Sequence, residues 1–173
     1  MPVLMCFSGL PGVGKSTIAR RLAQESGALW LWIDEIETAM RASHMRTDDL
    51  ADGGYAAAQA VARGVLRQGY NVIADCVNPI VLTRKAWEQV SSDTGARHLN
   101  VEFVCSDMEE HQRRVKQRSV SAPGCESSEW EAILQRDYTP MTEAEIRIDT
   151  AVTSAEQAVF QLCAAIRVHD QES

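Results

Sequence analysis

Residues 9–17 carry the feature that most constrains how this chain can fold. They read Gly-Leu-Pro-Gly-Val-Gly-Lys-Ser-Thr and fit the pattern G-x-x-x-x-G-K-[ST]. The motif follows a short apolar run, Val3 to Ser8, and precedes a segment with helical periodicity, Lys15 to Ser26. Glycines let backbone amides curl around a phosphate chain, and a helix N-terminus adds partial positive charge there. The sequence therefore predicts a strand, a phosphate-binding loop and a helix at the start of the fold.

The same motif predicts the ligands, which are ATP and magnesium. In loops of this pattern the lysine reaches the β and γ oxygens of the nucleotide, and the following hydroxyl ligates the metal. Lys15 is therefore a candidate catalytic residue and Ser16 a candidate magnesium ligand. The candidate nucleotide-binding residues of the loop are Gly9, Pro11, Gly12, Val13, Gly14, Lys15, Ser16 and Thr17.

Short β-like runs alternate with longer helical patterns along the whole chain, which is typical of an α/β fold with a parallel sheet. The first four runs are nearly continuously apolar, as strands covered on both faces must be. A length of 173 residues fits a single domain, so we expect one domain over residues 1–173. The five expected strands are Val3 to Ser8, Leu29 to Ile33, Asn71 to Cys76, His98 to Cys105 and Glu145 to Asp149.

Capping patterns place the helix starts. Asp34 with Glu37 forms a capping box for a helix that ends near Ser43. Asn78 is expected as an N-cap, with Pro79 at the first helical position. Two segments of polar and turn-forming residues, His44 to Gly53 and Val120 to Ser127, are expected to be mobile loops.

Charge and composition narrow the partners. The chain has 17 Lys and Arg against 24 Asp and Glu, a net charge of −7, so the basic footprint of a nucleic-acid binder is absent. The longest clear apolar run, Ala28 to Ile33, is too short to cross a bilayer. Five cysteines without a C-x-x-C pair are expected to be reduced core thiols. With no leader-like N-terminus, the expected location is the cytoplasm.

Elimination among nucleotide-binding classes leaves a small phosphotransferase. A GTPase needs a guanine-reading element of the N-K-x-D type, and the chain contains none. The large mechanochemical ATPases carry additional helical regions that 173 residues can scarcely house.

The order of motifs resembles the small P-loop kinases related to nucleoside monophosphate kinases. The resemblance rests on the P-loop and on the segments L-W-I-D-E-I-E-T-A-M-R, N-V-I-A-D-C-V-N-P, C-S-D-M-E-E-H-Q-R-R-V-K-Q-R, R-D-Y-T-P-M and I-R-I-D-T. These segments are similar to a bacterial branch related to chloramphenicol phosphotransferase, adenylylsulfate kinase, gluconate kinase and polynucleotide 5′-hydroxyl kinase. The resemblance implies a three-layer fold with five parallel strands in the order 2-3-1-4-5, helices on both faces, and transfer of the γ-phosphate of ATP to a hydroxyl.

The resemblance also implies roles for two carboxylates. Asp34 lies where the resembling kinases place the base that accepts the proton of the acceptor hydroxyl, although a helix cap alone is the alternative. Asp75 closes an apolar run, where such enzymes place a carboxylate on the magnesium side; a simple turn residue is the alternative.

Basic residues complete the expected site. Arg114 and Arg118 lie one helical turn apart beside a lid-like segment at about residues 113–128. The resembling enzymes use one such arginine on adenine and another on the transferred phosphoryl group, so Arg114 is a candidate nucleotide ligand and Arg118 a candidate catalytic residue. Candidates for contacting the acceptor, besides Asp34, are Arg41, Arg46 and Asn78.

The acceptor itself is left open. The carboxylates around Asp34 replace the D-G-D-N-x-R stretch usual in adenylylsulfate kinases, which favours a neutral or cationic small hydroxyl compound: a metabolite, a nucleoside or an antibiotic. A polynucleotide 5′-hydroxyl and a non-catalytic, nucleotide-dependent switch or toxin-like binding protein are the alternatives. The expected assembly is a monomer or a homodimer.

Overall fold

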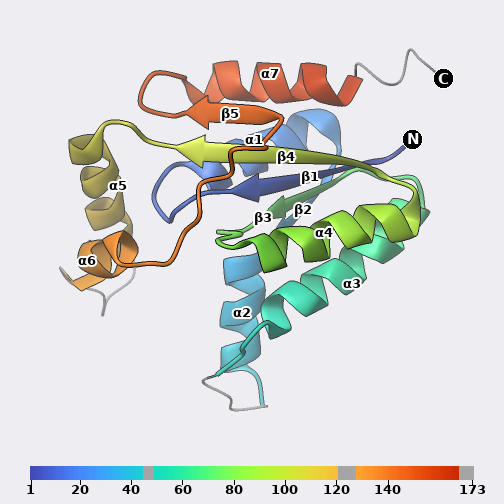
Figure 1. The fold of residues 1–173 in the computed structure, drawn as a ribbon, viewed down its shortest axis with the longest axis horizontal. Coiled ribbons are helices and arrows are strands. Elements are labelled where there is room, and N and C mark those ends of the chain that lie inside the picture. The colour runs from blue at the N-terminus through green and yellow to red at the C-terminus, as the bar shows by residue number, and fades with distance from the viewer. Residues whose placement is uncertain (45–48, 121–127, 168–173) are drawn as a thin grey trace.

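A computed structural model describes residues 1–44, 49–120 and 128–167, with the backbone alone at 118–120 and 128–129 (Figure 1). Helices and strands alternate as expected for an α/β chain. In chain order they are β1 (Val3–Ser8), α1 (Lys15–Ser26), β2 (Leu29–Trp32), α2 (Ile33–Ala42), α3 (Gly53–Arg67), β3 (Val72–Asp75), α4 (Val81–Thr94), β4 (Arg97–Val104), α5 (Met108–Val120), α6 (Ser128–Leu134), β5 (Ile146–Asp149) and α7 (Ala155–Arg167).

The five strands form one parallel sheet in the order β2-β3-β1-β4-β5, which confirms the predicted fold class and strand order. β1 is central because its six residues are all buried. The register pairs Phe7 with Asp75, so the strand that leads into the glycine-rich loop ends beside the end of β3. Because all strands run in the same direction, the loops after them meet at one edge of the sheet.

Two apolar layers cover the sheet, as alternate side chains of β1 show. Val3, Met5 and Phe7 pack with α1 and α7 in one buried cluster. Leu4 and Cys6 pack with α3 and α4 in the other. Figure 1 shows α7 and α1 on one side of the sheet and α3 and α4 on the other, with α5 and α6 beyond the carboxyl ends of the strands. This leaves the loop edge as the place for a site.

The bounds of β1 and α1 agree with the expected ones, but two expected helix caps are wrong. Helix α2 begins at Ile33, one residue earlier than expected, with Trp32 as its N-cap. The reason is burial: Ile33 is 1% exposed and belongs to the α3/α4 side of the core. Asp34 therefore lies inside the first turn and is not the cap.

Helix α4 begins at Val81 with Ile80 as N-cap, so Asn78 is not the cap either. Asn78 has a left-handed φ of 50° and is fully buried. Its carbonyl accepts a hydrogen bond from Arg84 Nε at 3.1 Å, and the Pro79 carbonyl accepts one from Arg84 Nη2 at 3.4 Å. Because the buried guanidinium of Arg84 uses these carbonyls, residues 78–80 stay irregular and helix geometry starts after them.

A search of the described parts of the chain finds no helix that combines the length and the apolarity required to cross a membrane.

Candidate active site

The glycine-rich loop adopts backbone angles that require its glycines. Gly9, Gly12 and Gly14 have φ angles of 144°, 85° and 98°, all in the region that only glycine adopts readily. Space is also limiting at Gly9, where a Cβ atom would collide with the carbonyl oxygen of Phe103 on β4. The loop can therefore follow its tight path over the end of the sheet only with these glycines.

Lys15 is buried, at 7% exposure, rather than lying on the surface of the loop. Its Nζ donates to the carbonyls of Gly9 and Leu10 at 2.8 and 3.0 Å. The ammonium group is therefore held across the mouth of the loop, where a phosphate chain bound by the loop amides would meet its charge.

A cavity of about 370 Å³ opens over this loop at the carboxyl ends of β1 and β3. Two carboxylates line it together with Lys15 and Ser16: Asp75 from the end of β3 and Asp34 from the first turn of α2. The residues that line the cavity are Pro11, Gly12, Gly14, Lys15, Ser16, Thr17, Trp32, Asp34, Asp75, Cys76, Val77 and Arg114. The structure thus brings the loop and both predicted carboxylates to one space.

Asp75 is held in a defined position at the bottom of the cavity. Burial, at 2% exposure, raises the pKa of this carboxyl, while the charge of Lys15 and hydrogen bonds from Ser16 and Trp30 act in the opposite direction. The indole N–H of Trp30 donates to Asp75 Oδ2 at 3.2 Å, and the ring of Trp30 stacks on Trp32 with centroids 5.5 Å apart. Two hydrogen-bond donors and the Lys15 charge therefore favour the ionised form, against the larger effect of burial.

The neighbouring Ser16 hydroxyl and Asp75 carboxylate fit a magnesium ion. Magnesium prefers oxygen ligands and is usually bound by one or two carboxylates together with substrate phosphates. Ser16 and Asp75 are such oxygen donors and contact each other, and Ser16 lies at the start of the helix that the phosphate chain would approach. The donor set therefore supports the expectation that these two residues hold the metal.

A second cavity, of about 350 Å³, adjoins the first. Arg114 lies between the two and is fixed by Thr150: Nη1 donates to Thr150 Oγ1 at 2.8 Å and Nη2 to its carbonyl at 3.1 Å. Thr150 Oγ1 donates in turn to the carbonyl of Val13, also at 2.8 Å. The lining residues are Gly14, Thr17, Ile18, Arg114, Thr150, Thr153, Ser154 and Ala155.

Arg113 and Arg114 of α5 differ in where their side chains lie relative to the two cavities. Arg113 points outward, with its side chain 56% exposed and its Nε 2.6 Å from Glu110. Of Arg113 and Arg114, only Arg114 lines the two cavities. Arg118 lies in the last turn of α5 and its side chain is not among those described. Most of the turn-rich part of the lid-like segment, residues 121–127, lies outside the described residues, as does Arg46.

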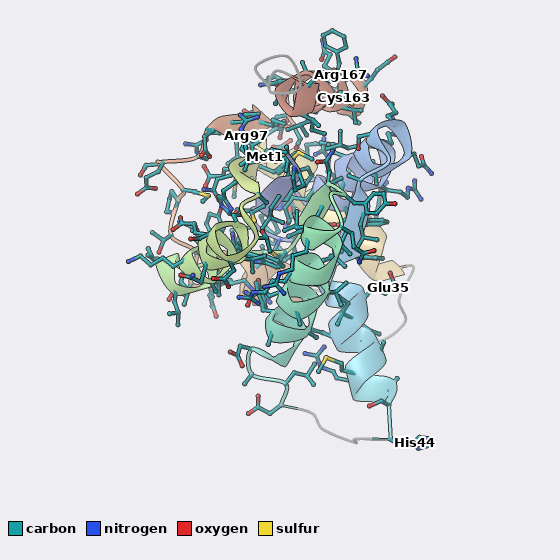
Figure 2. All side chains as sticks on the ribbon, turned by 90° about the vertical axis from the view of Figure 1, so that its right-hand side faces the viewer. Met1, Glu35, His44, Arg97, Cys163 and Arg167 are labelled. Atoms are coloured by element: carbon teal, nitrogen blue, oxygen red, sulfur yellow. The ribbon has the colours of Figure 1, made fainter. Side chains whose placement is uncertain are left out.

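The other acceptor-side candidates lie away from the cavity wall. Arg41 is near the end of α2, about 10 Å along the helix from Asp34, and its exposed guanidinium is 3.5 Å from Glu37. Asn78 is fully buried, and its Nδ2 donates to Ser8 Oγ at 3.0 Å. Figure 2 shows Glu35 on the outer side of α2 and His44 beyond the end of that helix. Asp34 is thus the α2 carboxylate that lines the cavity.

The residues at the site that sequence reasoning missed include Trp30, His111 and Thr150, each of which makes a contact that supports it. Thr150 follows β5 directly, as Asp75 ends β3, so its place at the carboxyl edge of the sheet was a usable signal. The hydrogen bond of Trp30 to Asp75 joins residues 45 apart in sequence, and no local pattern reveals it.

Comparison with known proteins gives a family match and many fold matches. Residues 4–140 match the family described as AAA domain. No curated protein matches the chain closely enough to count as a relative. Among solved structures, a Chloroflexus aurantiacus protein has a TM-score of 0.77 at 17% identity, covering 99% of this chain and 97% of its own.

Two further structures carry functional names. The Mycobacterium tuberculosis APS kinase, solved with AMPPNP and APS, has a TM-score of 0.71 at 19% identity, covering 99% of this chain and 98% of its own. A gluconokinase from Sinorhizobium meliloti has a TM-score of 0.64 at 19% identity with the same coverages. At these identities the likeness establishes the P-loop kinase fold.

Proposed function

Because the chain belongs to the AAA domain family and has the fold of P-loop kinases, we propose that it transfers the γ-phosphoryl group of ATP to a hydroxyl of a small molecule. One observation carries the proposal. Asp75, at the end of β3, and Asp34, in the first turn of the helix after the neighbouring strand β2, line one cavity together with Lys15 and Ser16. A phosphate-binding loop that only held nucleotide would need no second carboxylate at that cavity.

In the proposed reaction the acceptor hydroxyl oxygen forms a bond to the γ-phosphorus while the bond to the β-bridging oxygen breaks, releasing ADP. The Asp34 carboxylate accepts the hydroxyl proton, since it lines the same cavity as the phosphate-binding loop. The Lys15 ammonium, fixed by the Gly9 and Leu10 carbonyls, meets the negative charge on the phosphate oxygens. Ser16 and Asp75 would hold magnesium, which when bound would supply positive charge against the phosphate oxygens.

We place the nucleotide base in the second cavity. Arg114 lies at the junction of the two cavities, so its guanidinium can contact the base on one side and the phosphates on the other. This assignment leaves the part of the first cavity near Trp32 and Asp34 for the acceptor.

The charges of that region favour a neutral or cationic acceptor. Both cationic residues that line the first cavity, Lys15 and Arg114, lie on its phosphate side. On the acceptor side are the Asp34 carboxylate and the ring of Trp32, and the Glu37 carboxylate lies one turn further along α2. An anionic acceptor would meet like charge at Asp34, so a hydroxylated metabolite, nucleoside or antibiotic without a phosphate or sulfate is the proposed class.

An ADP-release screen tests the proposal. Purified protein with ATP and magnesium is assayed against a library of neutral, cationic and anionic hydroxyl compounds, with gluconate and adenylylsulfate included. The expected result is stimulated ADP release by a neutral or cationic compound and formation of its phosphate ester. ATP binding without stimulation by any hydroxyl compound would instead support a nucleotide-dependent binding protein.

The nucleotide site predicts the effect of Thr150→Val, which removes the hydroxyl between Arg114 and Val13 without changing the shape of the side chain. The affinity for ATP should fall about tenfold, and stability by about 1–3 kcal/mol, because the half-buried Arg114 guanidinium and the buried Val13 carbonyl each lose a partner. Isothermal titration calorimetry and thermal denaturation measure the two effects. Thr94→Val is the matched control, since its hydroxyl bonds only to α4 carbonyls; equal ATP affinity in both variants would contradict the prediction.

A further inference from the structure

The inner face of α5 carries a histidine for which the proposed reaction has no use. His111 is 4% exposed, and its Nε2 lies 2.8 Å from the carbonyl oxygen of Pro11 in the phosphate-binding loop. A carbonyl oxygen only accepts hydrogen bonds, so Nε2 carries the hydrogen. The contact joins residues 100 apart in sequence, and it ties a helix beyond the sheet to the loop.

The Pro11 carbonyl matters because of the amide that shares its peptide plane. A trans peptide is planar, and its C=O and N–H bonds point in opposite directions. The described chain has no cis peptide, so the Gly12 N–H points away from His111. Pro11 and Gly12 both line the cavity over the loop, which Arg114 of α5 also lines. Fixing the carbonyl toward His111 thus fixes the direction of the Gly12 N–H at the wall of the cavity that would receive the phosphates.

Side chains of α5 pack directly against Gly12, so a larger residue would not fit at this position. A Cβ atom on Gly12 would lie 2.5 Å from Val115 Cγ2 and 3.3 Å from the His111 ring. The ring is itself held from the other side by Trp130 of α6, in an edge-on contact with centroids 5.0 Å apart. Glycine has access to many backbone conformations, so without such a partner the peptide between Pro11 and Gly12 would sample other orientations.

Helix α5 therefore supports the loop at two points, directly at Pro11 and through Thr150 at Val13. His111 holds the Pro11 carbonyl, and Arg114, one turn later, holds Thr150, which holds the Val13 carbonyl. We infer that His111 is a positioning residue for nucleotide binding, which presets the Gly12 amide to receive a phosphate oxygen. The inference rests on the proposed nucleotide site and adds a residue that touches no substrate.

Substitutions at position 111 separate the hydrogen bond from packing. The amide nitrogen of glutamine can take the place of Nε2, whereas that of asparagine takes the place of Nδ1 and does not reach Pro11. His111→Leu and His111→Asn should each weaken ATP binding about tenfold, the effect of one buried hydrogen bond, and His111→Gln should restore it to within about threefold of the parent. The affinity for adenosine, which has no phosphate, should stay within twofold in all three variants.

Calorimetric titration with ATP, with adenosine and with a non-hydrolysable ATP analogue supplies these affinities, and thermal denaturation monitors folding. His98→Leu is the matched control: its ring bonds to Ser91 and Asn100 at 2.9 Å, away from the loop, so ATP affinity should not change. Equal ATP affinity in the Asn and Gln variants, or equal loss of ATP and adenosine binding, would overturn the inference. A parent protein that binds no ATP would instead overturn the proposed function.

Discussion

Lys15→Met should lower kcat by roughly 10²–10³-fold, the usual effect of removing one fixed group that stabilises charge in the transition state. Methionine keeps most of the aliphatic length of the side chain, which matters because Lys15 is buried rather than exposed. What it removes is the ammonium group that lies between the Gly9 and Leu10 carbonyls. Loss of these two hydrogen bonds should also lower stability, by about 1–3 kcal/mol.

Initial rates of ADP release at saturating ATP and acceptor measure this prediction, and a thermal melt shows whether the variant is folded. Lys85→Met is the control, because Lys85 is an exposed lysine of α4 that lines neither described cavity. A folded Lys15→Met variant that keeps a third or more of the parent kcat would refute the role of this lysine in phosphoryl transfer.

The features of this protein that depend on residues close together in the sequence were predictable. The P-loop motif fixes the conformation of its own glycines, so β1 and α1 have the expected bounds and the loop between them the expected φ angles. Buried parallel strands are continuous apolar runs, and such runs are visible in sequence. The strand order followed from the resemblance and not from any local signal, and the observed sheet confirms it.

Tertiary contacts overrode local signals where the predictions failed. The Asn78-Pro79 pair is a common helix start, yet the buried Arg84 side chain takes the carbonyls of both residues and shifts the start of α4 to Val81. In the same way, burial of Ile33 moved the start of α2 ahead of its capping box. A single sequence shows which residues are able to cap, but not which competing contact they will make.

The same limit applies to the candidate site. Asp34, Asp75, Lys15 and Ser16 were identified because each follows or ends a strand or belongs to the motif, and one cavity contains all four. The contacts of His111 with Pro11 and of Trp30 with Asp75 span 100 and 45 residues, and they depend on how α5 and β2 pack. Residues that support a site from a distance in sequence therefore become visible only in the folded chain.

Asp34→Asn should lower kcat by roughly 10²–10⁴-fold, because asparagine cannot accept the proton of the acceptor hydroxyl. The structure sharpens this test by removing the competing explanation: Trp32, not Asp34, is the N-cap of α2. Asparagine is nearly the same size as aspartate, so the variant should stay folded, and the lost charge near a helix N-terminus should cost about 0.3–1 kcal/mol of stability. ATP affinity should stay within twofold, since the proposed partner of Asp34 is the acceptor and not the nucleotide.

Glu35→Gln is the matched control for Asp34→Asn, because it removes a carboxylate at the next position of the same helical turn. Glu35 is exposed on the outer side of α2 and does not line the cavity, so kcat should stay within twofold of the parent (Figure 2). Rates of ADP release with the acceptor found in the screen decide the comparison. If Asp34→Asn keeps kcat within about threefold of the parent, the base assignment is wrong, and the half-buried Glu37, one turn further along α2, becomes the carboxylate to test.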